Sequence, residues 1–282
     1  MIDTGRLPKT MPATLIAMLA LTGCAVVDES ASTLTAGVHA GPLACSSQLV
    51  GSSVSAHGQL DSGDIQLVNW NIQKGGDPEW SNDLLAVPGD PDLMILQEAP
   101  QTSAAWGGAS TYQYHSFAPG YRTWRTMTGV MTVSTAKPLT QCNLVSVEPW
   151  LRSPKATVIT EYGLSNTSQT LLVANIHAVN FTFGIQEFKK QIRQALSVLD
   201  NHAGPILLSG DFNTWRRGRT TILNEMTDHL GLEVLDYDED HRKRFLGEPL
   251  DHIYVRGLEV LEATTHEVES SDHSPMSVRL RL

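Results

Sequence analysis

The feature that most restricts the fold is a series of short apolar runs that begins near residue 64. Gly, Pro, Asn or Asp bound each run, and runs of this kind are typical of buried β-strands. They predict eight strands, at residues 65–72, 92–98, 128–135, 156–164, 170–179, 205–212, 251–257 and 276–282.

The clearest helical pattern runs from Ile185 to Asp200. Its apolar residues recur every three or four positions, with lysines and an arginine on the opposite face, as in an amphipathic helix. A second helix is expected at 220–230, where Gly231 would end it. Many strands and few helices predict a layered α/β domain with mixed sheets. The pattern leaves open whether there are one or two sheets.

Polar residues recur where the predicted strands end. Strand ends and loops on a rigid scaffold are common places for chemistry. Taken singly, each such residue also has a structural explanation: Asp211 and Asn213 could shape a turn, and His177 could be a hydrogen-bonded core histidine. The series is Asn71, Glu98, His177, Asp211, Asn213, Asp251, Asp272 and His273.

The first 23 residues predict a signal peptide, because Arg6 and Lys9 precede an apolar run that is too short to span a bilayer. The following "LTGC", residues 21–24, resembles a bacterial lipobox, which implies lipidation of Cys24. A cleaved signal or a buried cysteine is the alternative. The expected organisation is a signal peptide at 1–23, a flexible tether at 24–62 and one domain at 63–282. By analogy with lipoproteins, Ala25 favours the periplasmic face of the outer membrane, within the bacterial cell envelope.

Two further cysteines, Cys45 and Cys142, could form a disulfide in an exported protein, but the sequence leaves their pairing open. The formal net charge of −10 argues against tight binding of nucleic acid through a basic face. It does not exclude an enzyme that meets a single phosphate through a metal ion.

Six motifs occur in an order and at spacings that resemble the endonuclease/exonuclease/phosphatase superfamily, over nearly the whole of residues 64–282. The resemblance implies a four-layered α/β sandwich, in which two mixed β-sheets pack face to face with helices outside. It also implies metal-dependent hydrolysis of phosphoester bonds. The protein is expected to be a monomer. The motifs are "NWNIQKG" (69–75), "LQEA" (96–99), "NIHAVNF" (175–181), "SGDFNTW" (209–215), "LDHIYV" (250–255) and "SSDHSPM" (270–276).

The metal implied by this resemblance is Mg²⁺ or Mn²⁺, which prefers hard oxygen ligands such as carboxylates and amides. Its candidate ligands are Asn71, Glu98 and Asp272. Some family members have an acidic residue where this chain has Gln73, so an extra carboxylate ligand is not expected there.

The resemblance also assigns catalytic candidates. Asp211 and Asn213 would orient the attacking water and the phosphate, with Asp211 as a proton acceptor. His273 would contact the phosphate or act as general acid/base, and Asp251 would fix its orientation. His177 would donate to a phosphoryl oxygen or protonate the leaving group.

Basic residues near the motifs are candidates for phosphate binding, with Arg152, Lys155 and Arg216 put forward first. The clusters at 216–219 and 242–244 could rim the pocket, or they could form solvated loops paired with nearby acids.

The function expected is a lipid-anchored, metal-dependent phosphodiesterase, nuclease-like in its substrate. One alternative is a phosphatase or a phosphodiesterase acting on phospholipid or sphingolipid, for which the sequence shows no obvious hydrophobic loop beside the motifs. The other is a non-catalytic surface lipoprotein, since a scaffold alone does not fix function.

Overall fold

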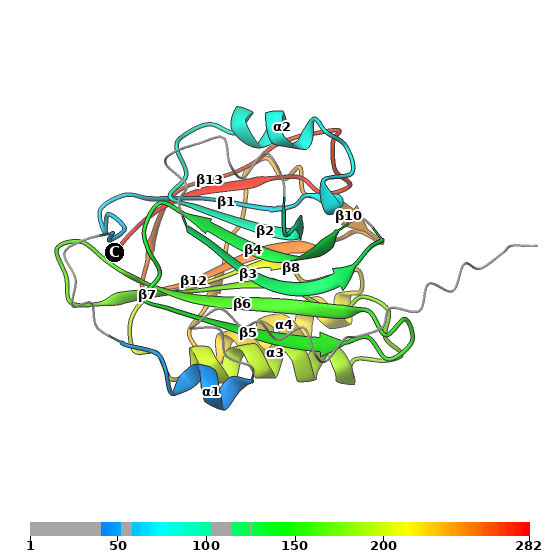
Figure 1. Ribbon diagram of the computed structural model, residues 1–282, viewed down its shortest axis with the longest axis horizontal. Coiled ribbons are helices and arrows are strands. Elements are labelled where there is room, and N and C mark those ends of the chain that lie inside the picture. Colours follow the sequence, from blue (N-terminus) through cyan, green and yellow to red (C-terminus); the bar gives the residue numbers. More distant parts are fainter. Residues whose placement is uncertain (1–40, 52–57, 103–113, 125) are drawn as a thin grey trace, which may run out of the picture.

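The computed structural model describes residues 41–51, 58–102, 114–124 and 126–282. Two six-stranded sheets pack face to face, with helices on both outer faces (Figure 1). This arrangement confirms the predicted four-layered α/β sandwich and answers the question of one sheet or two. The predicted signal peptide and Cys24 lie outside the described residues.

The first sheet is mixed, and its centre consists of parallel neighbours β1 (Ile65–Asn71) and β2 (Leu93–Pro100). On one side follow β4 (Met127–Ser134) and the edge strand β3 (Tyr114–Arg122). On the other side follow β14 (Met276–Arg281) and the edge strand β13 (Glu259–Thr265).

The second sheet has the same plan, with β7 (Thr170–His177) parallel to β8 (Ile206–Asp211) at its centre. On one side are β6 (Pro154–Gly163) and the edge strand β5 (Thr140–Val147), and on the other are β12 (Asp251–Arg256) and the short β9 (Glu233–Val234). A separate hairpin pairs β10 (Arg244–Phe245) with β11 (Glu248–Pro249) just before β12.

Helices cover the outer faces unequally. α2 (Trp80–Ala86) packs on the first sheet, while α1 (Pro42–Ser46), α3 (Gln186–Leu199) and α4 (Arg217–Asp228) lie beneath the second sheet (Figure 1). The α3 stripe predicted from the sequence faces the second sheet and is almost fully buried. Each such side chain contributes about 1.5–3 kcal/mol of hydrophobic free energy. Among the helices in the described residues, none combines the length and apolar character needed to cross a bilayer.

A disulfide joins Cys45 of α1 to Cys142 of β5. Cys45 is buried in the core between the second sheet and its helices. Further along, Leu60 is buried and forms a bridge with Leu164. The described residues of the segment expected to be a flexible tether, 24–62, therefore include contacts with the domain at Cys45 and Leu60.

Candidate active site

The candidate site lies at one end of the sandwich because of the parallel pairing at the centre of each sheet. β1 and β2 end together, and β7 and β8 end together, at the right in Figure 1. Carboxyl ends of neighbouring parallel strands place their terminal side chains at one edge. The antiparallel strand β12 begins there, and it pairs Asp251 with Asp211.

Gly210 makes the close approach of β7 and β8 possible. Its φ is 149°, and a Cβ atom there would lie 2.0 Å from the carbonyl oxygen of Ile176. Only glycine tolerates so close an approach of two backbones. The next pair in the register is His177 and Asp211, so this glycine brings two candidate catalytic side chains together.

Beneath the site, buried amide side chains connect the two sheets. Gln97 Nε2 donates to Asn69 Oδ1 at 3.0 Å and to Asn175 Oδ1 at 2.9 Å. The Ser209 hydroxyl donates to Asn69 Oδ1 at 2.9 Å. Directional bonds of this kind fix how the sheets align, because a buried polar group without a partner is costly.

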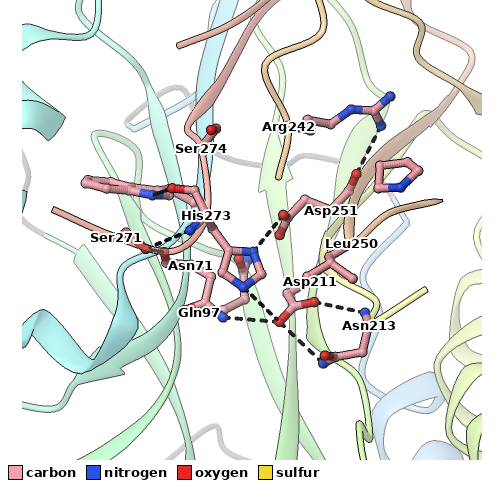
Figure 2. Close-up of polar contacts among 12 residues, drawn as sticks. Asn71, Gln97, Asp211, Asn213, Arg242, Leu250, Asp251, Ser271, His273 and Ser274 are labelled. Atoms are coloured by element: carbon pink, nitrogen blue, oxygen red, sulfur yellow. Dashed lines mark hydrogen bonds and ion pairs between the residues drawn. The ribbon is translucent and has the colours of Figure 1, made fainter. Parts of the chain in front are cut away.

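His273 and Asp251 form a buried pair. The imidazole Nδ1 lies 2.7 Å from Asp251 Oδ2, and Nε2 faces Asp211 Oδ2 at 3.9 Å, so the ring lies between two carboxylates (Figure 2). Burial opposes the charged ring, but the carboxylates of Asp251 and Asp211 outweigh it and raise the pKa of His273 to about 10. The ring is therefore a cation at neutral pH. Trp70 fixes the backbone here through Nε1, which donates to the His273 carbonyl.

Asp211 accepts hydrogen bonds from two residues, Asn71 and Asn213. Asn71 Nδ2 donates to Oδ2 at 3.1 Å, and the backbone amide of Asn213 donates to Oδ1 at 2.8 Å (Figure 2). Asn213 adopts a φ of 51° and donates from its side chain to the Ala178 carbonyl. Burial raises the pKa of Asp211 to about 6, against the lowering effect of His273. A carboxylate with such a pKa is suited to accept a proton near neutral pH.

His177 lies on the other side of Asp211. Its Nε2 is 3.4 Å from Asp211 Oδ2 and 2.6 Å from Lys155 Nζ. Burial first, and then the charge of Lys155, hold the pKa of His177 well below its usual value. The ring is therefore neutral, and Lys155 donates to its Nε2. Gln191 fixes the neighbouring backbone by donating to the His177 carbonyl.

Glu98 enters the site from a bulge in β2. The register with β4 shifts between Leu96 and Ala99, and Glu98 has a φ of 51°. One carboxylate oxygen contacts Lys74 Nζ at 2.8 Å, and the other lies 3.9 Å from His177 Nε2. Bulges often redirect a side chain at a functional site. Here the bulge brings Glu98 to the same histidine that Asp211 faces.

The residues present fit a divalent metal ion. Asp211, Asp251 and His273 form a buried group whose ligand atoms lie within 4.8 Å of one another. Asp251 Oδ1 is buried and has no hydrogen-bond partner within the described residues. Because His273 is protonated, it is a poor ligand. The oxygen donors of Glu98 and Asn71 therefore suit Mg²⁺ or Mn²⁺ better.

A pocket of about 430 Å³ opens beside these groups. Glu98, His177 and Lys155 line it, together with Lys74 and the apolar Leu151 and Phe181. The pocket thus combines carboxylate, cation and apolar surface, which is the usual composition of a ligand site.

The structure brings together most of the residues proposed from the sequence. Eight of them lie in the site or beside it: Asn71, Glu98, Lys155, His177, Asp211, Asn213, Asp251 and His273. Asp272 is exposed and lies outside the buried carboxylate group, although its charge helps to raise the pKa of His273. Arg152 is exposed on a turn, and Arg216 stacks on Trp215 at 4.1 Å. Neither arginine lines the pocket.

The two arginine clusters include buried structural residues. Arg219 donates to the carbonyls of Val179, Asn180 and Asn213 and to the hydroxyl of Thr182. Arg242 pairs with Asp240 and donates to the carbonyl of Asp251. These two side chains are buried and stabilise loops of the site. They do not line the edge of the pocket, which was one of the two roles expected for the arginine clusters from the sequence.

Sequence reasoning did not single out Lys74, although it lies within the first motif. Its contact with Glu98 depends on the short helix η1 (Gln73–Gly75), where Lys74 has a φ of 64°. The supporting amides Asn69, Gln97 and Asn175 were missed as well. The sequence did contain a signal for them, because each is a polar residue inside an apolar run. A polar side chain buried in a strand needs a hydrogen-bond partner.

Fold and site together define a class: α/β-sandwich proteins with a cluster of acids, amides and histidines at one end of the sheets. Residues 68–273 match the sequence model of the Endonuclease/Exonuclease/phosphatase family. The chain belongs to this family, whose members are generally hydrolases.

Among related sequences, a UPF0294 protein of Vibrio vulnificus (strain YJ016) is 35% identical over 229 residues, covering 78% of both chains. A UPF0294 protein of Yersinia pestis is 36% identical over 218 residues, covering 77% of this chain and 84% of the relative.

Solved structures share the fold at lower identity. The human Nocturnin catalytic domain with bound sulfate anion has a TM-score of 0.61 and 17% identity, covering 79% of this chain and 95% of that one. Sphingomyelinase C from Streptomyces griseocarneus has a TM-score of 0.54 and 17% identity, covering 77% and 99%. These likenesses show the DNase I-like fold and leave the substrate open.

Proposed function

We propose that this protein is a Mg²⁺- or Mn²⁺-dependent phosphodiester hydrolase. The observation that carries the proposal is the buried arrangement of His273 between Asp251 and Asp211, with distances of 2.7 and 3.9 Å. A cationic donor and a carboxylate of raised pKa, facing one another, are what the attack of water on a phosphodiester requires.

In this proposal each side chain has a separate task. Asp211, oriented by Asn71 and Asn213, accepts the proton of the attacking water. His273, held by Asp251, donates to a phosphoryl oxygen as negative charge develops. Lys155 and neutral His177 contact the phosphate on the opposite side.

Glu98 and Asn71 would hold the ion. When bound, the ion would polarise the phosphoryl group and neutralise its charge. Lys74, which contacts Glu98 and lines the pocket, would contribute positive charge beside the substrate phosphate.

The proposal is tested with a soluble chromogenic diester, bis(p-nitrophenyl) phosphate, in the presence of Mg²⁺ or Mn²⁺ and after chelation with EDTA. We expect turnover that depends on the ion and falls at least about 100-fold in Asp211→Asn, which keeps the volume of the side chain. A chain that hydrolyses neither this diester nor DNA or phospholipid would contradict the proposal and favour a non-catalytic binding role.

We also propose that the chain is an exported lipoprotein at the periplasmic face of the outer membrane. The signal-like segment and the "LTGC" sequence support this, and so does the disulfide, because disulfides persist in oxidising compartments. Labelling of cells with a radioactive fatty acid should mark the wild-type protein and leave Cys24→Ser unlabelled. Equal labelling of both proteins would refute acylation at Cys24.

A further inference from the structure

An exposed apolar surface borders the candidate active site. It consists of Trp150, Leu151, Phe181 and Phe183, which are 64%, 61%, 57% and 76% exposed. We refer to these four residues as the apolar rim. Trp150 and Leu151 lie in the turn between β5 and β6, and Phe181 and Phe183 follow β7, at the end of the sandwich that holds the site (Figure 1).

The rim is continuous with the pocket. Leu151 and Phe181 line the pocket together with Glu98, His177 and Lys155. Trp150 and Phe183 extend this surface outward, with ring centroids 4.5 Å apart in an edge-to-face contact. Anything that covers the rim therefore also covers the mouth of the pocket.

Two buried charged side chains hold the rim in place. Glu148 accepts the backbone amides of Asn180 and Phe181 at 2.6 and 3.3 Å, and its own backbone closes the turn that carries Trp150. Arg219 binds the carbonyls of Val179 and Asn180 from the inner side. Because the loops are fixed from within, the apolar side chains are presented to solvent by a braced backbone.

A second apolar projection lies at the same end. Phe245 and Leu246, at the turn between β10 and β11, are 56% and 76% exposed, and Figure 1 places β10 at the end of the sandwich where β1 ends. Contiguous exposed apolar surface with polar residues around it is a feature of interaction sites.

We infer that the apolar rim docks on a lipid bilayer, so that the site faces the head-group layer and acts on phosphodiesters of membrane lipids. This inference rests on the proposed hydrolase function. Aromatic side chains that are surrounded by polar residues are suited to the interface between water and lipid. Arg152, exposed between Leu151 and the pocket-lining Ser153, supplies a cation at head-group level.

Charge favours lipid over nucleic acid as the occupant. The chain carries a formal net charge of −10, and Arg219 and Arg242 are used internally. Binding of nucleic acid depends on many phosphate contacts, and a negative net charge opposes them. If Cys24 is acylated, residues 25–40 cannot place the domain more than about 60 Å from the bilayer.

Docking can be measured by fluorescence quenching, which reports insertion of the rim whether or not an acyl anchor holds the chain. The full-length protein is mixed with phosphatidylethanolamine/phosphatidylglycerol vesicles whose acyl chains are brominated. We expect part of the tryptophan fluorescence to be quenched in the wild type and that part to be missing in Trp150→Phe. In Leu151→Ser/Phe183→Ser the quenching should fall at least five-fold. Leu85→Ser is the matched control, since Leu85 is 74% exposed on α2, on the outer face of the first sheet, and should behave as the wild type.

Hydrolysis of unbrominated vesicles and of an oligonucleotide is then compared with that of bis(p-nitrophenyl) phosphate. Trp150→Ser/Phe183→Ser, which leaves the pocket lining unchanged, should lose at least ten-fold more activity on vesicles than on the soluble diester. Turnover of the soluble diester without quenching of Trp150, or hydrolysis of the oligonucleotide but not of the vesicles, would overturn the docking inference. Quenching without turnover of any diester would leave docking supported and refute the hydrolase function on which the choice of substrate rests.

Discussion

His273 Nδ1 lies 2.7 Å from the buried carboxylate of Asp251, and the opposite ring nitrogen faces Asp211. The pair joins the loop before β14 of the first sheet to the start of β12 in the second sheet. The histidine is thus oriented across the interface of the two sheets. Its charge and its direction both depend on their correct packing.

The rate of diester hydrolysis should have two pH limits set by this arrangement. Asp211 must be ionised to accept a proton, so the rate rises through its pKa of about 6. His273 must keep its proton, so the rate falls as pH passes its pKa of about 10. In Asp251→Asn the largest influence that raises the His273 pKa is removed, and the alkaline limit should move to lower pH, with a loss of about 100-fold or more in kcat. A pH–rate profile with an unmoved alkaline limit would contradict the role of Asp251.

The metal requirement separates two candidate ligands. Glu98 lines the pocket, whereas Asp272 is exposed and outside the buried group. We expect Glu98→Gln to raise the Mg²⁺ concentration for half-maximal activity at least about ten-fold, as loss of one carboxylate ligand weakens binding. Asp272→Asn is the matched substitution, and its Mg²⁺ titration should stay within a few-fold of the wild type. A larger effect at Asp272 would place the ion on that side of His273.

Arg219 should matter for stability far more than its neighbour Arg217. Lysine at 219 cannot satisfy four acceptors, so Arg219→Lys should lower the free energy of unfolding by about 2–4 kcal/mol. Arg217→Lys changes an exposed residue and should cost less than about 0.5 kcal/mol. Urea unfolding measures both variants. Equal effects would mean that the buried bonds of Arg219 add little to stability.

Stability should decrease in mild acid because of His252. Burial lowers the pKa of this histidine to about 3, and it hydrogen-bonds Thr214 at 2.7 Å. An unfolded histidine takes a proton as pH falls below about 6.5, while the folded one stays neutral until about pH 3. Protonation of this histidine in the unfolded chain therefore lowers the free energy of unfolding by up to about 1.4 kcal/mol for each pH unit between about 6.5 and 3. His252→Gln should flatten the slope of unfolding free energy between pH 6 and 4, and an unchanged slope would exclude His252 as its source.

The disulfide should stabilise the native state by restricting the unfolded chain. It closes a separation of 97 residues, for which loss of the cross-link typically costs about 2–5 kcal/mol. Cys45→Ala/Cys142→Ala should therefore have a lower urea midpoint than the wild type under oxidising conditions. With a reductant present the two proteins should converge. A wild-type midpoint that does not respond to the reductant would show that the bridge contributes little.

The sequence by itself determined the strands at the centre of the sheets. All eight predicted strands are interior strands, four in each sheet, because burial on both faces produces the uninterrupted apolar runs that the pattern detects. The edge strands β3, β5, β9 and β13 escaped prediction, since they are partly exposed and their sequences alternate or are polar. The helix predicted at Ile185–Asp200 is α3, and the one predicted at 220–230 begins earlier, at Arg217.

The residues that surround the site could also be predicted from the sequence, because the six motifs occur in a fixed order and each contains polar residues of a particular type. The role of each residue depends on the tertiary structure. Arg219 and Arg216 are three positions apart, and only packing makes the first a buried brace and the second an exposed ring partner of Trp215. Trp150 and Phe183 belong to different loops, and no local pattern connects them. Their contact beside the pocket exists because β5, β6 and β7 are neighbours in one sheet, which brings distant turns to the same end.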